Sequence, residues 1–446
     1  MGIYKQRKGL NLSKVAEEVL FRWEKNQTFE KSISKRADGP SFVFYEGPPS
    51  SNGLPGIHHV MARTIKDVFC RYKTLMGYQV NRKAGWDTHG LPVELGVEKE
   101  LGITKDDIGK TISIEDYNTA CKKAVMRYTS AWNELTHKMG YWVNTKEPYI
   151  TYENKYIESV WWLLKQAFDK GLIYKGYTIQ PYSPMAGTGL SSHELNQPGC
   201  YKDVKDTSIT AQFLMEETGK KVFNSKKNVF CLAWTTTPWT LPSNTALAVN
   251  KNIQYVLVET FNQYTKIPVA VVVAEQLVPK VFSAPFVRID ELVDRNKQIP
   301  YKIVQHIMGA ELVGLKYHQL MPLVEPYENK ENAFKIIHGD FVSTEDGTGI
   351  VHIAPTFGAD DAKVAKESNV PPMLVMGPNG ELVPLVNLKG AFIDGLGVFS
   401  GKLVKSEYHK KVDQNTQPVD VEIAIHLKEQ NKAFKVEKYE HSYPCL

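Results

Sequence analysis

The sequence predicts an α/β protein that opens as a doubly wound sheet and continues into a separate β-rich domain. The first observation behind this prediction is the order of patterns in residues 42–77: an apolar run, a loop rich in Gly and Pro, and a helix with one apolar face. Strand, loop and helix in that order form the opening unit of a doubly wound sheet. The second observation is a change near residue 205, after which short β-branched and aromatic runs are separated by Pro, Asn and Gly.

Composition limits the function classes. A chain of 446 residues has room for about two to four domains, and its 42% hydrophobic and 23% charged residues are typical of soluble globular proteins. No run approaches the ~18 apolar residues of a membrane span, and no signal-peptide pattern is present, so we expect no membrane partner and a cytoplasmic location. The five cysteines include no CxxC pair, which argues against a disulfide framework or a zinc knuckle. The net charge of +5 is compatible with nucleic acid without indicating it.

Local signals place the first elements. Asn11 or Ser13 is a suitable cap for a helix running to about Lys25, and residues 42–45 form a strand. The helix after the Gly/Pro loop is expected to end at Gly77.

Two further helices are predicted before residue 175. Ser113 and Asp116 form a capping box for a helix that we expect to continue through Leu135. Another helix runs from about Asn154 and is closed by Gly171.

The β-rich part is predicted to hold strands at residues 230–234, 255–259, 269–273 and 334–337. The expected organisation is an N-terminal helical segment (1–40), an α/β domain with connecting helices (41–204), a β-rich domain (205–400) and a segment that returns toward the α/β domain (401–446).

A loop that suits nucleotide phosphates follows the first strand. Gly47 and Gly53 allow a ligand to approach the backbone, and the helix after the loop presents free N–H groups to an anion. His58 and His59 add donors in its first turn. Taken alone, this stretch favours the simpler alternative, in which the histidines cap a helix or pack in a core.

A second stretch, RKAGWDTHGLPVE at residues 82–94, follows an extended segment. The Asp87 carboxylate beside the Trp86 ring suits the ammonium group of an amino-acid substrate. The simpler alternative is an aspartate that caps a turn.

Together, residues 46–59 and 85–94 resemble the class I aminoacyl-tRNA synthetases. The resemblance implies the first half of a Rossmann-type catalytic domain, with ATP and Mg²⁺ as substrate. In that family the amino-acid carboxylate attacks the α-phosphate of ATP to give an aminoacyl-adenylate, and catalysis is mostly positioning and charge stabilisation.

The resemblance also assigns residue roles. His59 matches the second histidine of the family's His-x-Gly-His ATP signature, and Asp87 matches the residue that holds the substrate α-amino group. Here the signature reads GIHH at residues 56–59, so that the first histidine and the glycine have exchanged places. His58 either supplies the missing donor or crowds the nucleotide. The implied ATP-site residues are Gly47, Pro48, Asn52, Gly56, His58 and His59, and the implied amino-acid site residues are Trp86 and Asp87.

Residues 91–102, 139–142 and 156–162 resemble the isoleucine-specific branch of the family. The partners implied are isoleucine, ATP and tRNA(Ile), and we expect a monomer. Family members often carry a zinc knuckle near residues 181–194, but Ser183 and Met185 stand there with only Cys200 nearby, so no zinc is predicted.

Two stretches of the β-rich part carry polar residues in an unusual density. The first is AWTTTPWTLPSN at residues 233–244, and the second is DGTGIVHIAPTFGADD at residues 346–361. Each has a simpler explanation. A Thr-rich run is usually an edge strand, a lone His352 is usually structural, and the pair of carboxylates at residues 360–361 caps a helix more often than it binds Mg²⁺.

Both stretches resemble the β-barrel-like editing domain that is inserted into isoleucine, valine and leucine synthetases, where it hydrolyses tRNA carrying the wrong amino acid. The resemblance implies that Asp361 grips the α-amino group of valine on tRNA(Ile) and that His352 contacts the substrate. Thr235, Thr236, Thr237 and Trp239 then shape the pocket and support the attacking water, without a metal.

The chain has no Lys-Met-Ser-Lys-Ser-like loop, which lies far downstream in the family and holds ATP. We therefore expect a fragment of an isoleucine–tRNA ligase with at most editing activity. Two alternatives stay open: a free-standing editing deacylase, for which residues 42–94 would be idle, and a non-catalytic tRNA-binding relative, which the exchanged histidine would suit.

Overall fold

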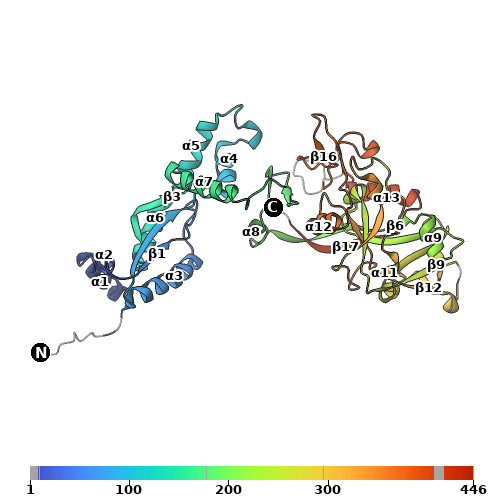
Figure 1. Cartoon of the computed structure of the whole chain (residues 1–446), viewed down its shortest axis with the longest axis horizontal. Coiled ribbons are helices and arrows are strands. Elements are labelled where there is room, and N and C mark those ends of the chain that lie inside the picture. Colours follow the sequence, from blue (N-terminus) through green and yellow to red (C-terminus); the bar gives the residue numbers. More distant parts are fainter. Residues whose placement is uncertain (1–8, 10, 177, 295, 406–415, 445–446) are drawn as a thin grey trace. The chain divides into compact units, whose positions relative to one another are not determined.

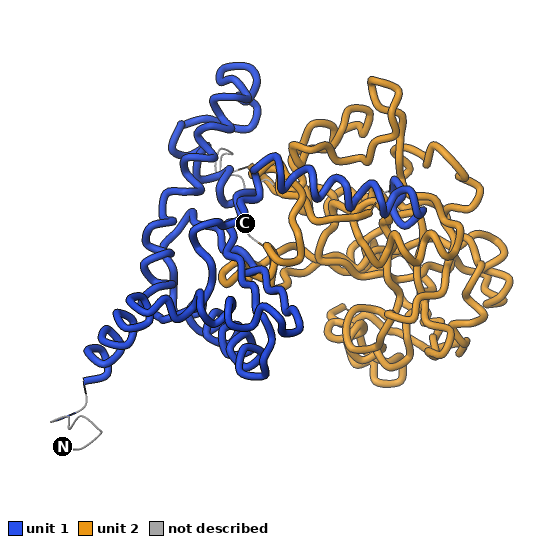
Figure 2. The backbone as a smooth tube through the Cα atoms, turned by 60° about the vertical axis from the view of Figure 1, so that its left-hand side comes forward, with its two compact units in different colours: residues 1–176 blue, residues 177–446 orange. Residues whose placement is uncertain are grey.

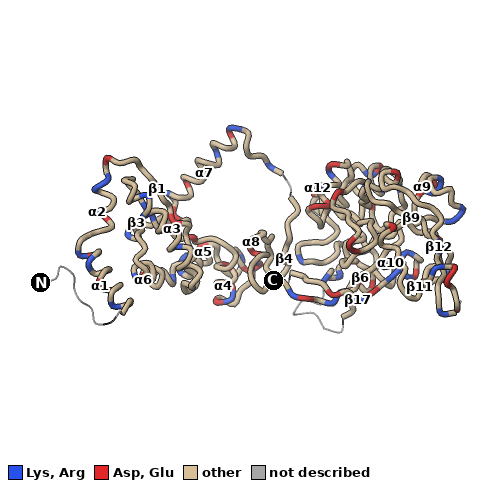
Figure 3. Tube along the Cα trace, turned by 90° about the horizontal axis from the view of Figure 1, so that it is seen from below, with Lys and Arg blue, Asp and Glu red and all other residues tan. Residues whose placement is uncertain are grey.

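The computed structural model describes residues 9, 11–176, 178–294, 296–405 and 416–444. The chain divides into two compact units, Met1–Gly176 and Tyr177–Leu446 (Figure 2). The predicted domain boundaries near residues 40, 204 and 400 are finer than this division and stay predictions. Lys and Arg residues are interspersed with Asp and Glu residues along the backbone of both units (Figure 3). No helix among the described residues has the length and apolar content that crossing a membrane requires.

The first unit is built on a parallel three-stranded sheet in the order β1-β2-β3. The strands are β1 (Ser41–Tyr45), β2 (Gln79–Trp86) and β3 (Asn144–Ile150), and α3 (Ile57–Leu75) connects the first two (Figure 1). A buried ion pair from Arg82 Nη1 to Asp67 Oδ1, 2.9 Å long, joins β2 to α3. This strand–helix–strand unit confirms the predicted α/β class. The other helices are α1 (Leu12–Lys25), α2 (Thr28–Ser34), α4 (Leu91–Leu101), α5 (Ile114–Val125), α6 (Thr129–Lys138) and α7 (Asn154–Asp169).

Short-range capping signals are confirmed. The Asn11 side chain accepts a hydrogen bond from the backbone of Lys14 at the start of α1, so Asn11 rather than Ser13 is the cap. Ser113 accepts from the backbone of Asp116 at the start of α5. Gly171, with φ +69°, follows the end of α7.

The prediction of one continuous helix from residue 113 through residue 135 is wrong. The helix is interrupted between α5 and α6, because the loop after β1 competes for its backbone. The Ser51 hydroxyl donates to the carbonyl of Val125, and the Tyr128 N–H donates to the carbonyl of Ser51 at 3.3 Å. The interruption therefore anchors the Gly/Pro loop.

The second unit is centred on a seven-stranded sheet in the order β11-β12-β9-β10-β7-β6-β17. A smaller sheet, β13-β8-β14, lies beside it in the same unit, and β15 pairs with β16 and β4 with β5. The strands of the large sheet are β6 (Tyr201–Leu214), β7 (Val229–Thr235), β9 (Gln254–Phe261), β10 (Pro268–Ala274), β11 (Phe286–Arg288), β12 (Ile299–Met308) and β17 (Ala433–Pro444). The remaining strands are β4 (Tyr182–Ser183), β5 (Thr188–Gly189), β8 (Ala246–Val249), β13 (Lys335–His338), β14 (Val351–Ile353), β15 (Leu374–Met376) and β16 (Leu382–Pro384).

Short helices complete this unit: α8 (Ser192–Leu195), α9 (Glu217–Val222), α10 (Val278–Val281), α11 (Gly309–Leu312), α12 (Ala359–Glu367) and α13 (Val419–Glu429). The large sheet carries the core, since β7 and β10 are buried on both faces. The four predicted strands are confirmed as β7, β9, β10 and β13. The β7 strand, which ends in the Thr-rich run, lies between β10 and β6, so the edge-strand alternative is wrong.

The last described residues also belong to the large sheet. Strand β17 pairs antiparallel with β6 from Ala433 opposite Ala211 to Pro444 opposite Tyr201. The predicted return of this segment to the α/β domain stays a prediction. Cys200, the one cysteine near the expected position of a zinc knuckle, is buried, and its thiol donates to the carbonyl of Glu194.

Candidate functional sites

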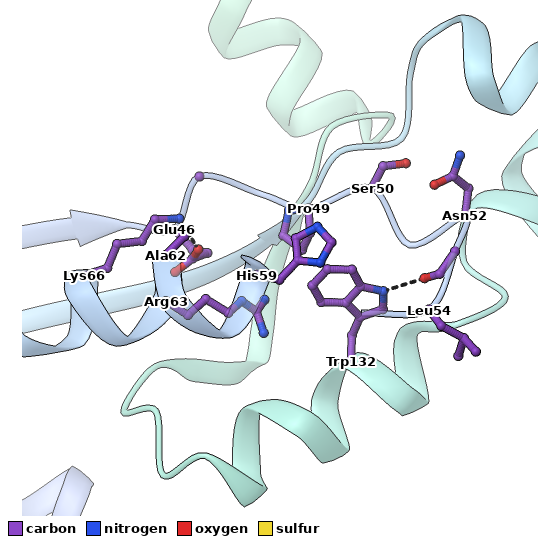
Figure 4. A pocket seen from close by; sticks show the side chains of 12 residues that line it. Glu46, Pro49, Ser50, Asn52, Leu54, His59, Ala62, Arg63, Lys66 and Trp132 are labelled. Atoms are coloured by element: carbon purple, nitrogen blue, oxygen red, sulfur yellow. Dashed lines mark hydrogen bonds and ion pairs between the residues drawn. The ribbon is translucent and has the colours of Figure 1, made fainter. Parts of the chain in front are cut away.

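A pocket of about 330 Å³ lies where the loop after β1 meets the start of α3 and the side of α6 (Figure 4). It is lined by Glu46, Gly47, Pro49, Ser50, Asn52, Gly53, Leu54, His59, Ala62, Arg63, Lys66 and Trp132. Of the predicted ATP-site residues, the pocket gathers Gly47, Asn52 and His59, while Pro48, Gly56 and His58 are outside the lining set.

The loop is held over the pocket by Trp132 of α6. The Trp132 indole N–H donates to the carbonyl of Gly53 at 2.9 Å (Figure 4). The ring of the same tryptophan meets the His59 ring edge-on, with 4.7 Å between centroids, and the Arg63 guanidinium lies 5.0 Å from its centroid. One buried aromatic side chain thus fixes the loop, the histidine and the arginine together.

Charged side chains of α3 line the floor. Lys66 Nζ lies 2.6 Å from Oε1 of Glu46, which is 2% exposed, and the Tyr141 hydroxyl donates to the other carboxylate oxygen. Arg63 donates to the Thr136 hydroxyl at 2.7 Å, and burial lowers the pKa of its guanidinium. Two cations against one carboxylate leave the pocket suited to an anion.

Sequence reasoning missed Arg63 and Lys66. They follow His59 by four and seven residues, a spacing that places all three on one face of a helix. This helical spacing was the signal that would have found them.

His59 has a defined tautomer. Its Nδ1 accepts the backbone N–H of Gly56 at 2.9 Å, so the proton of the neutral ring is on Nε2. Burial, then the neighbouring His58 and Arg63 charges, lower the pKa of His59. The ring therefore caps its own helix and offers a neutral donor at the pocket.

His58 lies outside the pocket lining but against His59, with 3.8 Å between ring centroids. A Cβ atom built on Gly56 would lie 2.9 Å from Cε1 of His58. The imidazole of His58 thus occupies the space into which a side chain at position 56 would project, so a larger residue there would require the His58 ring to move.

Asp87 follows directly after β2 and lies beside the same loop. Its N–H donates to the carbonyl of Pro49 at 3.1 Å, and it forms a β-bridge with Ser50. The Asp87 carboxylate accepts a long hydrogen bond of 3.4 Å from the backbone N–H of His89. This is the contact that the turn-capping alternative predicts. Trp86 is buried, 5% exposed. The loop therefore connects the predicted ammonium site to the phosphate pocket.

In the second unit, the Thr-rich run turns sharply at the end of β7. The Thr235 and Thr237 hydroxyl oxygens are 3.2 Å apart, and Thr235 Oγ1 accepts the N–H of Thr237 at 3.1 Å. Thr236 lies half-buried in this turn, and a 3₁₀ turn follows over Pro238–Ser243. The run therefore presents hydroxyls at a turn.

His352 on β14 contacts this turn through Thr240. The Thr240 hydroxyl donates to the carbonyl of Thr237 at 2.8 Å, so it accepts from Nε2 of His352, 2.9 Å away. Nδ1 of His352 then carries a lone pair and, among the described residues, has no partner. Burial lowers the pKa of His352 to about 4, which keeps the ring neutral.

Asp361 lies in the first turn of α12, whose N-cap is Gly358, so the capping alternative is wrong. Its Oδ2 accepts the N–H of Ala354, directly after β14, at 2.8 Å. Burial raises the pKa of Asp361 to about 6, and the Asp360 carboxylate adds to this effect. Within the described ranges no group of three or more His, Cys, Asp or Glu is arranged to hold a metal ion.

Trp239 completes this second site. Its ring packs edge-on against Phe357 with 4.8 Å between centroids, and its buried indole N–H has no partner among the described residues. The elements at the ends of β7 and β14 therefore bring five of the predicted residues together: Thr235, Thr237, Trp239, His352 and Asp361. Sequence reasoning missed Thr240, although it lies within the same run.

Comparisons with known proteins agree on one family. Residues 18–310 match the family model of tRNA synthetases class I (I, L, M and V). The isoleucine–tRNA ligase of Bacteroides fragilis strain YCH46 is 56% identical over 97% of this chain and 39% of its own length, and that of Cytophaga hutchinsonii is 58% identical over 99% and 40%. The isoleucine–tRNA ligase of Clostridium tetani is 42% identical over 96% and 36%. The chain spans about two fifths of the length of these relatives.

Among solved structures, the GlLeuRS-CP1 crystal structure matches 52% of this chain and 100% of its own, at 15% identity and a TM-score of 0.34. The editing domain of the P. falciparum cytosolic leucyl-tRNA synthetase matches 37% of this chain and 67% of its own, at 15% identity and a TM-score of 0.27.

Proposed function

The chain belongs to the class I tRNA synthetases. From this premise we propose that its function is that of an isoleucine–tRNA ligase that also hydrolyses valine from tRNA(Ile). The observation that carries the proposal is the 53–58% identity, over 97% or more of this chain, to relatives named isoleucine–tRNA ligase. The partners are isoleucine, ATP with Mg²⁺, and tRNA(Ile). A monomeric state and a cytoplasmic location stay predictions from the sequence.

The first site is proposed to form isoleucyl-adenylate. A carboxylate oxygen of isoleucine attacks the α-phosphorus of ATP, the bond to the β-phosphate breaks, and pyrophosphate leaves. Arg63, Lys66 and the Nε2–H of His59 face the pocket from one side of α3, where they stabilise charge on the phosphates. The free N–H groups at the start of α3 add to this stabilisation.

His58 is proposed to take the place of the displaced signature histidine. Its ring already fills the space beside Gly56 and contacts His59, so an imidazole is kept next to His59 despite the exchanged order. A phosphate that extends past His59 would meet it there.

Asp87 is proposed to bind the isoleucine ammonium group. Its position next to Pro49 and Ser50 keeps the amino acid beside the phosphate pocket, which turns adenylate formation into a reaction between positioned groups. Trp86, buried at the end of β2, is proposed to support this position.

The second site is proposed to hydrolyse the ester of valyl-tRNA(Ile). Water attacks the carbonyl carbon, the ester bond to the ribose oxygen breaks, and valine and free tRNA leave. Asp361 as carboxylate grips the α-amino group, and His352 offers the unpaired Nδ1 as an acceptor. Thr235, Thr236, Thr237 and Trp239 shape the pocket, and Thr236 and Thr237 support the water.

A second site is needed because size alone discriminates poorly. One missing methylene changes binding by only about 1–3 kcal/mol, a limit for which isoleucine against valine is the standard illustration. A smaller pocket that accepts and hydrolyses valine supplies the remaining accuracy.

Calorimetric titration of the 446-residue chain tests the first site, with a sulfamoyl analogue of isoleucyl-adenylate as probe. We expect binding that is tighter than for the leucyl analogue and weakened at least tenfold by Asp87→Ala, since a charged hydrogen bond contributes about 1.5–3 kcal/mol. Equal affinity for the two analogues, or no effect of the substitution, would contradict the assignment.

A further inference from the structure

The turn that carries the proposed editing residues is capped from a distant part of the chain. The backbone N–H of Trp239 donates to Oδ1 of Asp420 at 2.8 Å, across 181 positions of sequence. Asp420 lies in the first turn of α13 and is 2% exposed.

This contact replaces a local cap. The first N–H groups of a helical turn lack partners within the turn, and the N-cap side chain usually accepts one of them. Here the N-cap residue is Thr237, whose side chain makes no capping hydrogen bond. Its hydroxyl pairs with Thr235 instead. Because Asp420 accepts the N–H of Trp239, the Thr237 hydroxyl is not required for the cap.

Asp420 is itself held in place by a buried charge cluster. Lys405 Nζ lies 2.8 Å from Oδ2 of Asp420 and 2.9 Å from Oδ2 of Asp206 on β6. Nε2 of His441 on β17 lies 3.1 Å from the same oxygen of Asp206. The side chains of Lys405, Asp206 and Asp420 are each no more than 10% exposed. A carboxylate bound at both oxygens in such surroundings has little freedom to rotate.

The turn is thus fixed at two places. At the start of the turn, Asp420 accepts the backbone N–H of Trp239. One residue later, the Thr240 hydroxyl forms hydrogen bonds with the Thr237 carbonyl and with His352. A shift at Trp239 would move Thr237 and the partner of His352 together.

We propose that Asp420 is a positioning residue for editing hydrolysis: it caps the turn at Trp239, so that the Thr237 hydroxyl is left for the reacting water. This inference rests on the proposed editing function. Asp420 acts through the backbone of Trp239 and needs no contact with the substrate.

Steady-state deacylation of valyl-tRNA(Ile) by the 446-residue chain tests it. For Asp420→Ala we expect kcat to fall about 100-fold with KM within about twofold, because misplacement by about 1 Å has an effect of that size. Asp420→Asn keeps an oxygen acceptor for Trp239 but turns its NH2 group toward Lys405, so its kcat should lie between those of wild type and Asp420→Ala. The matched control is Asp206→Asn, which weakens the same charge cluster without touching the Trp239 contact, and its kcat should stay within about threefold of wild type.

A further variant tests whether a loss of activity is due to misfolding. Replacing buried ion-paired groups together often leaves stability unchanged, so Lys405→Met with Asp420→Leu and Asp206→Asn removes the cap without leaving the Asp206 charge buried and unpaired. Its kcat should match that of Asp420→Ala. Wild-type kcat in this triple variant would overturn the proposal.

Amide hydrogen exchange at Trp239 separates this inference from the proposed function. We expect exchange there to accelerate at least tenfold in Asp420→Ala and to stay unchanged in Asp206→Asn. If the wild-type chain releases no valine, the editing function fails and the positioning role fails with it, whereas the exchange still reports whether Asp420 caps the turn. Active wild type with unchanged exchange, or faster exchange with unchanged kcat, would overturn the positioning role alone.

Discussion

Nε2 of His352 lies 2.9 Å from the hydroxyl oxygen of Thr240, which joins two motifs that are 112 positions apart in the sequence. The Thr240 hydroxyl also donates to the Thr237 carbonyl. This pair therefore fixes both the tautomer of the buried histidine and the shape of the Thr-rich turn.

Thr240→Val tests this link. Valine keeps the shape of threonine but leaves Nε2–H of His352 buried without an acceptor, so we expect the free energy of unfolding to fall by about 1–3 kcal/mol. Urea unfolding measures this change. Thr240→Ser restores the hydroxyl and should lie within about 1 kcal/mol of wild type, and equal stabilities for Val and Ser would contradict the assigned hydrogen bond.

Asp361 predicts a pH-dependent stability difference. Its pKa of about 6 in the fold lies above the ordinary value of 3.8, so the folded state holds a proton that the unfolded state has lost between these values. The wild type should therefore lose stability as pH rises from about 4 to about 6, and Asp361→Asn should be more stable than wild type by about 1–3 kcal/mol at pH 8.

The difference between wild type and Asp361→Asn should vanish near pH 4, where the Asp361 carboxyl is protonated in both states. Thermal unfolding at pH 4 and pH 8 measures it. A constant difference at both pH values would show that the asparagine acts by packing rather than through the charge. Deacylation, which needs the carboxylate, should fall in the wild type below about pH 6.

The exchanged ATP signature predicts a compensating pair of substitutions. Gly56→His alone should place a side chain where the His58 ring already lies, and His58→Gly alone should remove the imidazole. Each single variant should weaken binding of the isoleucyl-adenylate analogue about tenfold. The double variant, which restores the family order, should bind within about threefold of wild type, a clear departure from additivity. Additive losses in the double variant would show that His58 does not replace the missing histidine.

Local signals in the sequence were enough for much of the fold. Asn11 and Ser113 cap helices as expected, because a cap involves atoms only three residues apart. Strand β7 was placed correctly, but its position inside the sheet depends on pairing with β6 and β10, which the Thr-rich run does not encode. The split between α5 and α6 depends on Ser51, more than 70 positions away.

The site residues also divide into those that local sequence patterns reveal and those that depend on long-range contacts. Those within the two motifs were accessible from sequence, and Arg63 and Lys66 were accessible from their helical spacing with His59. Asp420 was not, because its role arises from a hydrogen bond to Trp239 that only the folded chain brings about.

The most direct test of the account is the hydrolysis of valyl-tRNA(Ile) by the 446-residue chain, with isoleucyl-tRNA(Ile) as the competing substrate and Asp361→Ala as the control. We predict release of valine that is much faster than release of isoleucine and that is lost in the variant. Release no faster than the uncatalysed rate, or equal release by Asp361→Ala, would contradict the account.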